Sequence, residues 1–254
     1  MKKIFSFIFF VFIAYQFTSC TFLDKKGINK LWMYGDEMSS PDFDSCKLTP
    51  VSFLFLHPDG TYTKDFGSFE YGKWVTDNKK IVFRDQKNRT KVYSIKYSLP
   101  DNLKLIAADG FVAGFDAKPF SFSSAVEDPF SLQNNSWRIP ATHKETDKEL
   151  TARLMNHCHF WELYFTWALN DDIDYLDVRS APTLLKVYGN GLVLKYFADL
   201  PKKWKAYFFD EDDCRKANDM MQNIFEEHKI KIEQTKNRYK MFVSMFQQLQ
   251  KLLQ

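Results

Sequence analysis

The sequence lacks the short motifs on which most enzyme, metal and cofactor sites depend. It has four cysteines in 254 residues, and no two of them form a CxxC pair, which argues against structural zinc and thioredoxin-like redox chemistry. It also has no HExxH helix, no GxSxG nucleophile elbow and no glycine-rich phosphate-binding loop. We therefore expect a protein that is not an enzyme and that holds no cofactor or metal.

Glycine, proline and excess charge are also scarce. Nine glycines and nine prolines make up about 7% of the chain, too little for a collagen-like or linker-like protein. The formal net charge of +3 is too small for a dedicated nucleic-acid binder. Aromatic residues, by contrast, reach 17%, which predicts a core filled by large, flat side chains.

The first twenty residues have the pattern of an export signal. Lys2 and Lys3 precede an apolar run over residues 4–15 that only Ser6 interrupts, and the segment ends in Phe17-Thr18-Ser19-Cys20. A basic start, a short apolar stretch and a small-residue exit are typical of a secretory signal peptide. The run is too short to span roughly 30 Å of hydrocarbon.

On these residues the chain resembles bacterial lipoproteins, whose signal ends in a cysteine that becomes the lipid-modified first residue. The resemblance implies a signal peptide over 1–19 and a membrane anchor at Cys20, where several acyl chains (palmitate among them) would hold the protein on the bilayer. Thr21 stands where this class has Asp when it stays in the inner membrane, so the outer membrane is favoured and the leaflet is open. The alternative is a soluble secreted protein in which Cys20 is incidental.

Removal of the signal would leave 254 − 19 = 235 residues, enough for two compact domains. It would also remove Lys2 and Lys3 and so lower the net charge to +1. Cys46, Cys158 and Cys214 would then remain in an oxidising compartment. Either two of them form one disulfide, in any of three pairings, or all three are buried thiols.

The first half of the chain has the spacing of an antiparallel sheet. Short apolar or alternating runs recur every eight to twelve residues, with turns such as Pro58-Asp59-Gly60 between them. We predict six strands, at residues 51–57, 61–63, 69–75, 81–83, 93–97 and 103–105. No helical stretch intervenes, so the sheet is expected to curl or close into a barrel.

Over residues 30–107 the chain is similar to the lipocalin-like domains of bacterial lipoproteins. The matching residues are Trp32, the run 55–62 (FLHPDGTY), Gly72-Lys73-Trp74, Tyr93-Ser94-Ile95 and Leu103-Lys104-Leu105, and residues 35–46 form an insertion. The resemblance implies a small barrel but no particular ligand. Aromatic residues that we expect to line a pocket, or equally to fill the core, are Phe53, Phe55, Tyr62, Trp74, Phe83 and Tyr93.

The second half mixes helical and extended patterns. Residues 108–136 are expected to be a loop whose five phenylalanines pack across a domain surface, and we place the boundary between a domain of 20–130 and one of 131–254 there. In the second domain, a helix over about 144–169 is expected to follow a Thr142/Glu145 capping pair. Strands are expected at 137–139 and 175–178, a hairpin at 183–197 around Gly189-Asn190-Gly191, and a further extended run at 204–209.

The last forty residues keep helical spacing to the C-terminus. Asp210 is expected to cap a helix that, if unbroken from about 212 to 254, would extend roughly 60 Å, so part of it should project, bend or pack on the first half. The predicted fold class is therefore α+β: an N-terminal antiparallel meander or barrel followed by an α+β domain with a long C-terminal amphipathic helix.

Three clusters of polar residues in the second half are candidate sites. His157 and His159 lie two apart near Cys158 and Glu162, a spacing that turns the two rings to different helix faces, so packing of His157 is favoured over metal binding. Asp171, Asp172, Asp174 and Asp177 lack the regular spacing of a calcium loop. Basic residues of the C-terminal helix, which favour either an anionic surface or simple solvation, are Lys229, Lys231, Lys236, Arg238, Lys240 and Lys251.

Together these patterns favour a lipid-anchored binding or interaction module of the cell envelope, with the membrane and an envelope protein as partners. One alternative is a carrier that holds a small apolar ligand inside the barrel. Another is an envelope hydrolase or metal enzyme that uses His157, His159 and Asp174.

Overall fold

The computed structural model describes residues 25–34, 52–66, 68–77, 79–108, 110, 112–118, 122, 124–170, 202–221 and 238–254. Several predicted features lie outside these residues: the signal peptide and Cys20, the insertion with Cys46, and everything expected between 171 and 200, including Asp174 and the hairpin. Of the six basic residues expected on the C-terminal helix, Lys229, Lys231 and Lys236 also lie outside.

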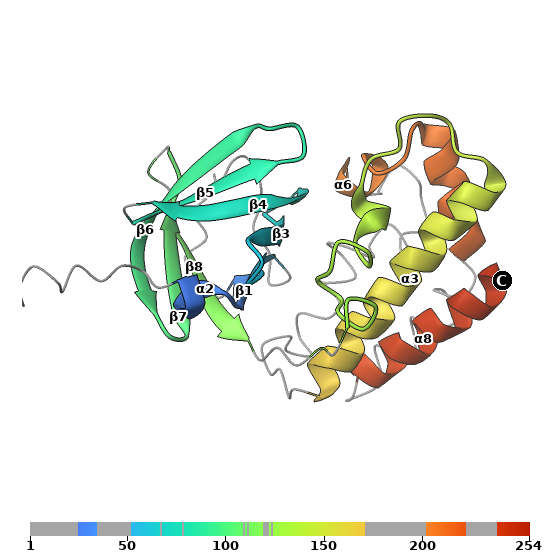
Figure 1. The fold of residues 1–254 in the computed structure, drawn as a ribbon. Coiled ribbons are helices and arrows are strands. Elements are labelled where there is room, and N and C mark those ends of the chain that lie inside the picture. Colours follow the sequence, from blue (N-terminus) through green and yellow to red (C-terminus); the bar gives the residue numbers. More distant parts are fainter. Residues whose placement is uncertain are drawn as a thin grey trace, which may run out of the picture.

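Eight antiparallel strands close into a barrel in which each strand pairs with its neighbours in the chain and β1 pairs with β8 (Figure 1). A short helix, α2 (Lys25–Ile28), precedes them. The strands are β1 (Leu31–Tyr34), β2 (Phe53–Leu56), β3 (Thr61–Asp65), β4 (Phe69–Asp77), β5 (Lys80–Asp85), β6 (Thr90–Leu99), β7 (Asn102–Ile106) and β8 (Val112–Lys118).

All six predicted strands are present as β2 to β7, and the predicted barrel is confirmed. The expectation of a loop throughout 108–136 is wrong at its start, because residues 112–118 form β8. This strand pairs with both β7 and β1 and so closes the barrel. Phe115 in β8 is fully buried rather than spread over a domain surface.

Strands β1 and β2 are buried on both faces, which explains their unbroken apolar sequences LWMY and FLFL. Trp32, Leu54 and Leu56 point into the barrel and join its core. The alternate residues Leu31, Met33, Phe53 and Phe55 point outward and join the core of the helical part.

The barrel interior is filled by aromatic and aliphatic side chains. Tyr62 and Phe83 lie with ring centroids 4.6 Å apart, and Phe83 and Tyr93 are 5.7 Å apart. The buried hydrophobic residues of this core are Ile28, Trp32, Tyr34, Leu54, Leu56, Tyr62, Phe66, Trp74, Ile81, Phe83, Tyr93, Ile95, Leu103, Leu105, Ala113 and Phe115.

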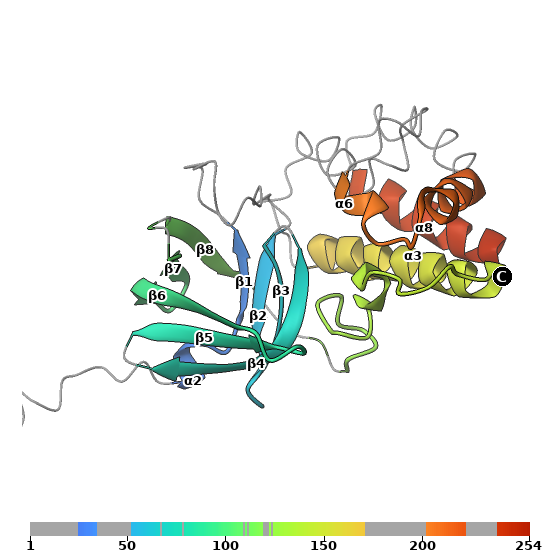
Figure 2. The same cartoon turned by 90° about the horizontal axis from the view of Figure 1, so that it is seen from above.

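The described helical part begins with a 3-10 turn, η1 (Ser136–Arg138), and α-helices pack around it. They are α3 (Asp147–Asn170), α6 (Lys202–Lys205) and α8 (Arg238–Leu253), with a further helical stretch over residues 211–221. Helix α8 runs antiparallel to α3, because Phe242 stacks on Phe165 at 4.5 Å while Phe246 stacks on Trp161 at 6.3 Å (Figures 1 and 2). None of the described helices is long and apolar enough to cross a bilayer.

The structure confirms the fold class and the long helix near 144–169 but corrects three details. Residues 137–139, predicted as a strand, lie in and just after η1, and residues 204–209, predicted as extended, finish α6 and continue in turns. The sequence predicts a helix of roughly 60 Å only if it is unbroken. Its described stretches, 211–221 and α8, both join the core around α3 (Figure 1).

The third correction concerns helix capping. Helix α3 begins after Thr146, whose hydroxyl accepts the Glu149 amide at 3.3 Å while Glu149 accepts the Thr146 amide at 2.8 Å. The predicted cap pair Thr142/Glu145 is therefore four residues too early. The predicted cap at Asp210 is confirmed, since its carboxylate accepts the Asp213 amide at 2.9 Å.

The outer face of β1 and β2 shares a hydrophobic core with the helical part, and this core is separate from the one inside the barrel. The outward side chains of β1 and β2 pack directly on Phe130 and the aromatic face of α3, with Phe53 and Phe130 at 4.9 Å. A buried ion pair joins Asp65 on β3 to Arg138 in η1, and both side chains are at most 1% exposed. The Thr63 hydroxyl donates to the Phe130 carbonyl at 2.7 Å.

Candidate functional site

The structure divides the six residues predicted to line a pocket between two cores. Tyr62, Trp74, Phe83 and Tyr93 fill the barrel, whereas Phe53 and Phe55 lie on its outer face against the helices. They do not surround one common space. Of the six, only Tyr62 also contributes to the pocket described next.

A pocket of about 470 Å³ lies outside the barrel, where the β2–β3 turn and strands β3 and β4 meet the loop before η1. We call it the junction pocket. Its lining residues are His57, Asp59, Thr61, Tyr62, Thr63, Tyr71, Gly72, Gln86, Phe122, Ser124, Ala125, Asp128, Ser131 and Leu132.

The barrel side of the junction pocket is a rigid turn. Asp59 accepts the Thr61 amide at 2.8 Å and the Thr61 hydroxyl at 2.7 Å, the pattern of an Asx turn. Gly60 follows with a φ of +82°, a conformation that glycine adopts without strain. The His57 ring packs on Phe55 with centroids 3.9 Å apart, so its position is set by the same turn.

The other side is a loop that side chains hold in place. Asp128 accepts the Phe130 amide at 2.7 Å. The Asn134 side-chain amide donates to the carbonyls of Ala125, Val126 and Asp128 at 2.8 to 3.1 Å. The Ser131 hydroxyl donates to the Ala125 carbonyl at 2.8 Å. The loop is therefore preformed without regular secondary structure.

Burial controls the charge of the junction pocket. It raises the pKa of Asp128 to about 7, against which the amides of Phe130 and Ser131 act only in part. Burial lowers the pKa of His57, so its imidazole is neutral at pH 7. Hydrogen bonds from Thr61 lower the pKa of Asp59, which stays ionised. The lining includes no lysine or arginine, so its charge comes from Asp59 and, as pH rises through 7, from Asp128.

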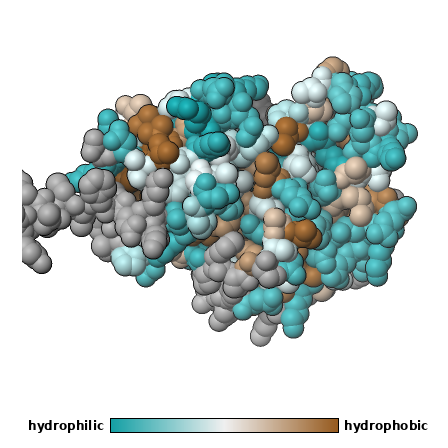
Figure 3. All heavy atoms as spheres, in the orientation of Figure 1, coloured by the Kyte–Doolittle hydropathy of each residue, from teal (hydrophilic) through white to brown (hydrophobic). Residues whose placement is uncertain are grey.

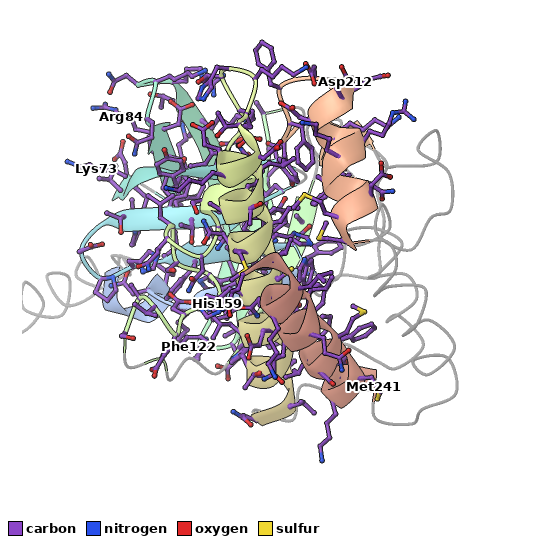
Figure 4. All side chains as sticks on the ribbon, turned by 90° about the vertical axis from the view of Figure 1, so that its right-hand side faces the viewer. Lys73, Arg84, Phe122, His159, Asp212 and Met241 are labelled. Atoms are coloured by element: carbon purple, nitrogen blue, oxygen red, sulfur yellow. The ribbon has the colours of Figure 1, made fainter. Side chains whose placement is uncertain are left out.

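The cluster around His157 is a packing element, as expected. His157 is fully buried, and its ring meets Trp137 at 4.5 Å and Trp204 at 4.9 Å. Burial lowers its pKa to about 3. His159 lies on another face and reaches Glu162 at 3.9 Å, and Glu162 also binds Gln247 and Gln250 of α8 (Figure 4).

Within the described part of the chain, no group of three or more His, Cys, Asp or Glu side chains is placed to hold a metal ion. Cys158 and Cys214 are both buried free thiols, so neither takes part in the single disulfide that the cysteine count allowed. Burial raises the pKa of Cys214 to about 12 and that of Cys158 further, which makes both thiols unreactive.

Sequence reasoning found the turn at 58–60 but missed the other side of the junction pocket. The loop around Asp128 carries no periodicity, and an Asp before Pro129 indicates only a turn. Its proximity to β3 depends on a tertiary contact that no local pattern announces. No protein-family model, curated protein or solved structure matches this chain.

Proposed function

We propose that the chain is a lipid-anchored envelope protein that binds a small neutral or cationic ligand in the junction pocket. The observation that carries the proposal is the pocket itself, a preformed space of about 470 Å³ between barrel and helices. Pockets of this size that combine aromatic walls with a few fixed polar groups are typical of small-molecule sites.

The lining favours the ligand class. Asp59 and Asp128 supply carboxylates, and the neutral His57 supplies no compensating positive charge. Tyr71 and Phe122 add aromatic rings, which attract cations through their faces. An amine with an apolar body satisfies both features, whereas an anion would meet only like charge.

A site outside the barrel is better supported than a carrier function within it. The side chains of Tyr62, Trp74, Phe83 and Tyr93 occupy the interior that an apolar ligand would need. The anchor is supported by the residues Phe17-Thr18-Ser19-Cys20 after a short apolar run.

Benzylamine and benzoate test the ligand class as a matched pair of opposite charge. We expect benzylamine, but not benzoate, to raise the melting temperature of the protein. Leu132→Trp, which fills the pocket from its wall, should abolish the shift. Leu252→Trp, a change of the same size at an exposed position on α8, should preserve it. Equal shifts with the two probes, no shift with either, or no effect of Leu132→Trp would refute the site.

Metabolic labelling with radioactive palmitate tests the anchor separately. The wild-type chain should incorporate label and stay with membranes through a high-salt wash, and Cys20→Ser should lose both properties. An unlabelled wild-type chain would remove the anchor and leave the ligand site untouched.

A further inference from the structure

The barrel has one outer face that the helical part leaves open. The outward residues of β1, β2 and β3, and Phe69 at the start of β4, pack on the helical part. The rest of β4 runs with β5 and β6 along the edge of the barrel beside α3 (Figure 2), and their outward residues do not join that core. Beyond Tyr71, strand alternation places these residues outward: Lys73, Val75 and Asp77 on β4, Lys80, Val82 and Arg84 on β5, and Thr90, Val92 and Ser94 on β6. Lys96 is exposed at the register shift between Ile95 and Tyr97. We call this surface the β4–β6 face.

Three valines form a row across the middle of the β4–β6 face. Val75 pairs with Val82, and Val82 pairs with Val92. Val75 is 49% exposed and Val92 is 43% exposed, and Figure 3 shows apolar atoms grouped on the surface of the barrel among hydrophilic ones. Their position in one row makes them a strip rather than isolated apolar residues.

Positive charge surrounds the valine row. Lys73 and Arg84 pair across one side of it and project away from the barrel (Figure 4). Lys80 and Lys96 lie on the other side, where Asp77 is the one acidic outward residue of these strands, so the face carries 4 − 1 = +3 charges. No carboxylate in the described segments forms an ion pair with any of these four cations, although eleven other ion pairs or His–carboxylate contacts involve different residues.

The chain enters the barrel close to this face. Lys30, just before β1, donates to the Pro100 carbonyl and lies 3.7 Å from Asp101, so β1 begins at the β6–β7 turn. Lys96 lies four residues before Pro100 on β6. Cys20 is five residues from the start of α2 at Lys25, a stretch that spans at most about 18 Å. A lipid at Cys20 would therefore hold this end of the barrel at the bilayer.

We propose that the β4–β6 face docks on an anionic lipid surface, with the four cations at the headgroups and the valine row at the level of the acyl boundary. Clustered Lys and Arg around a shallow apolar strip match the charge and polarity of such an interface. The proposal takes its orientation from the proposed anchor, but the face can be tested without it.

The test uses the chain from residue 20 with Cys20→Ser, which has neither leader nor acyl group and retains every residue that makes a described contact. It is sedimented with vesicles of phosphatidylcholine alone or of phosphatidylcholine with phosphatidylglycerol. We expect binding to the anionic vesicles only, reduced by high salt. Lys73→Glu with Arg84→Glu should weaken it at least roughly tenfold, and Val75→Asn with Val92→Asn should weaken it without removing its salt dependence.

The matched control is Lys148→Glu with Lys251→Glu, which makes the same change of charge at exposed positions on α3 and α8. It should bind like the parent chain, and circular dichroism confirms that each variant is folded. Equal binding to both vesicle types, no binding to either, or an equal loss in the control pair would overturn the proposal. Loss of palmitate labelling would instead overturn the anchor alone, so the two failures are distinguishable.

Discussion

Several ionisable side chains are buried away from water. Lys64 points into the barrel with 1% of its side chain exposed and binds Glu70 at 2.9 Å, and Lys91 binds the other oxygen of Glu70 at the same distance. Burial lowers the pKa of Lys64, and although burial acts to raise the pKa of Glu70, the two lysines hold it below its usual range. Asp128 differs because no cation pairs with it in the described structure, and its pKa rises.

This difference gives Asp128 a measurable effect on the pH dependence of stability. Its folded pKa of about 7 lies above the ordinary value of 3.8, so between these pH values the folded state binds more protons, and stability falls as pH rises. Between pH 5 and 8 the loss should be about 2–3 kcal/mol. Asp128→Asn retains an oxygen for the Phe130 amide and should flatten this part of the curve, as urea unfolding at both pH values would show. A loss of the same size in the variant would assign the effect to another group.

Gly72 tolerates no side chain for a reason of space. A Cβ at this position would lie 2.1 Å from the Arg84 carbonyl oxygen on β5. Gly72→Ala should therefore push β4 and β5 apart and destabilise the barrel by about 3 kcal/mol. Gly27→Ala is the control, since nothing lies within 4 Å of a Cβ there, and it should change the free energy of unfolding by less than about 0.5 kcal/mol. Similar values for both variants in urea unfolding would contradict the clash.

At the scale of elements, two substitutions distinguish the observed N-cap of α3, Thr146, from the N-cap that the sequence predicted, Thr142. Thr146→Ala removes the hydroxyl that accepts the Glu149 amide and should cost about 1 kcal/mol. Thr142→Ala changes the residue that the sequence pattern favoured, but Thr142 is exposed and lies before the helix, so stability should be unchanged within about 0.5 kcal/mol. A larger cost at Thr142 would place the cap where the pattern had it.

The elements that the sequence predicted well are those with a local signal. Strands β4 to β7 alternate in polarity and are bounded by turns, and α3 and the Asp210 cap follow helical rules. Strand β8 was missed because V-A-G-F-D-A-K shows little alternation and its partner β1 lies more than eighty residues earlier in the chain. Residues 204–209 were misread because aromatic residues favour strands on propensity, whereas here Trp204 packs on His157 and Tyr207 on Trp137.

At the scale of the whole molecule, the Asp65–Arg138 pair connects the two halves. Arg138→Met would leave Asp65 buried without its guanidinium partner and should cost about 3–5 kcal/mol. Adding Asp65→Leu removes the stranded charge, so the double variant should be more stable than Arg138→Met alone. The cycle is measured by urea unfolding with tryptophan fluorescence, and strict additivity of the two single changes would show that the charges act independently.

The sequence predicts a domain boundary near residue 130, but the burial of the outer faces of β1 and β2 makes the two parts dependent on each other. In the described structure, their outward side chains Leu31, Met33, Phe53 and Phe55 share a core whose other members come mostly from residues after 130. A protein fragment that ends at residue 130 would expose these apolar side chains to water, so we expect it to aggregate or to bind a chaperone. The barrel is therefore not expected to fold when it is fused to an unrelated protein in place of its helical part. Substitutions on the two sides of this contact should co-vary.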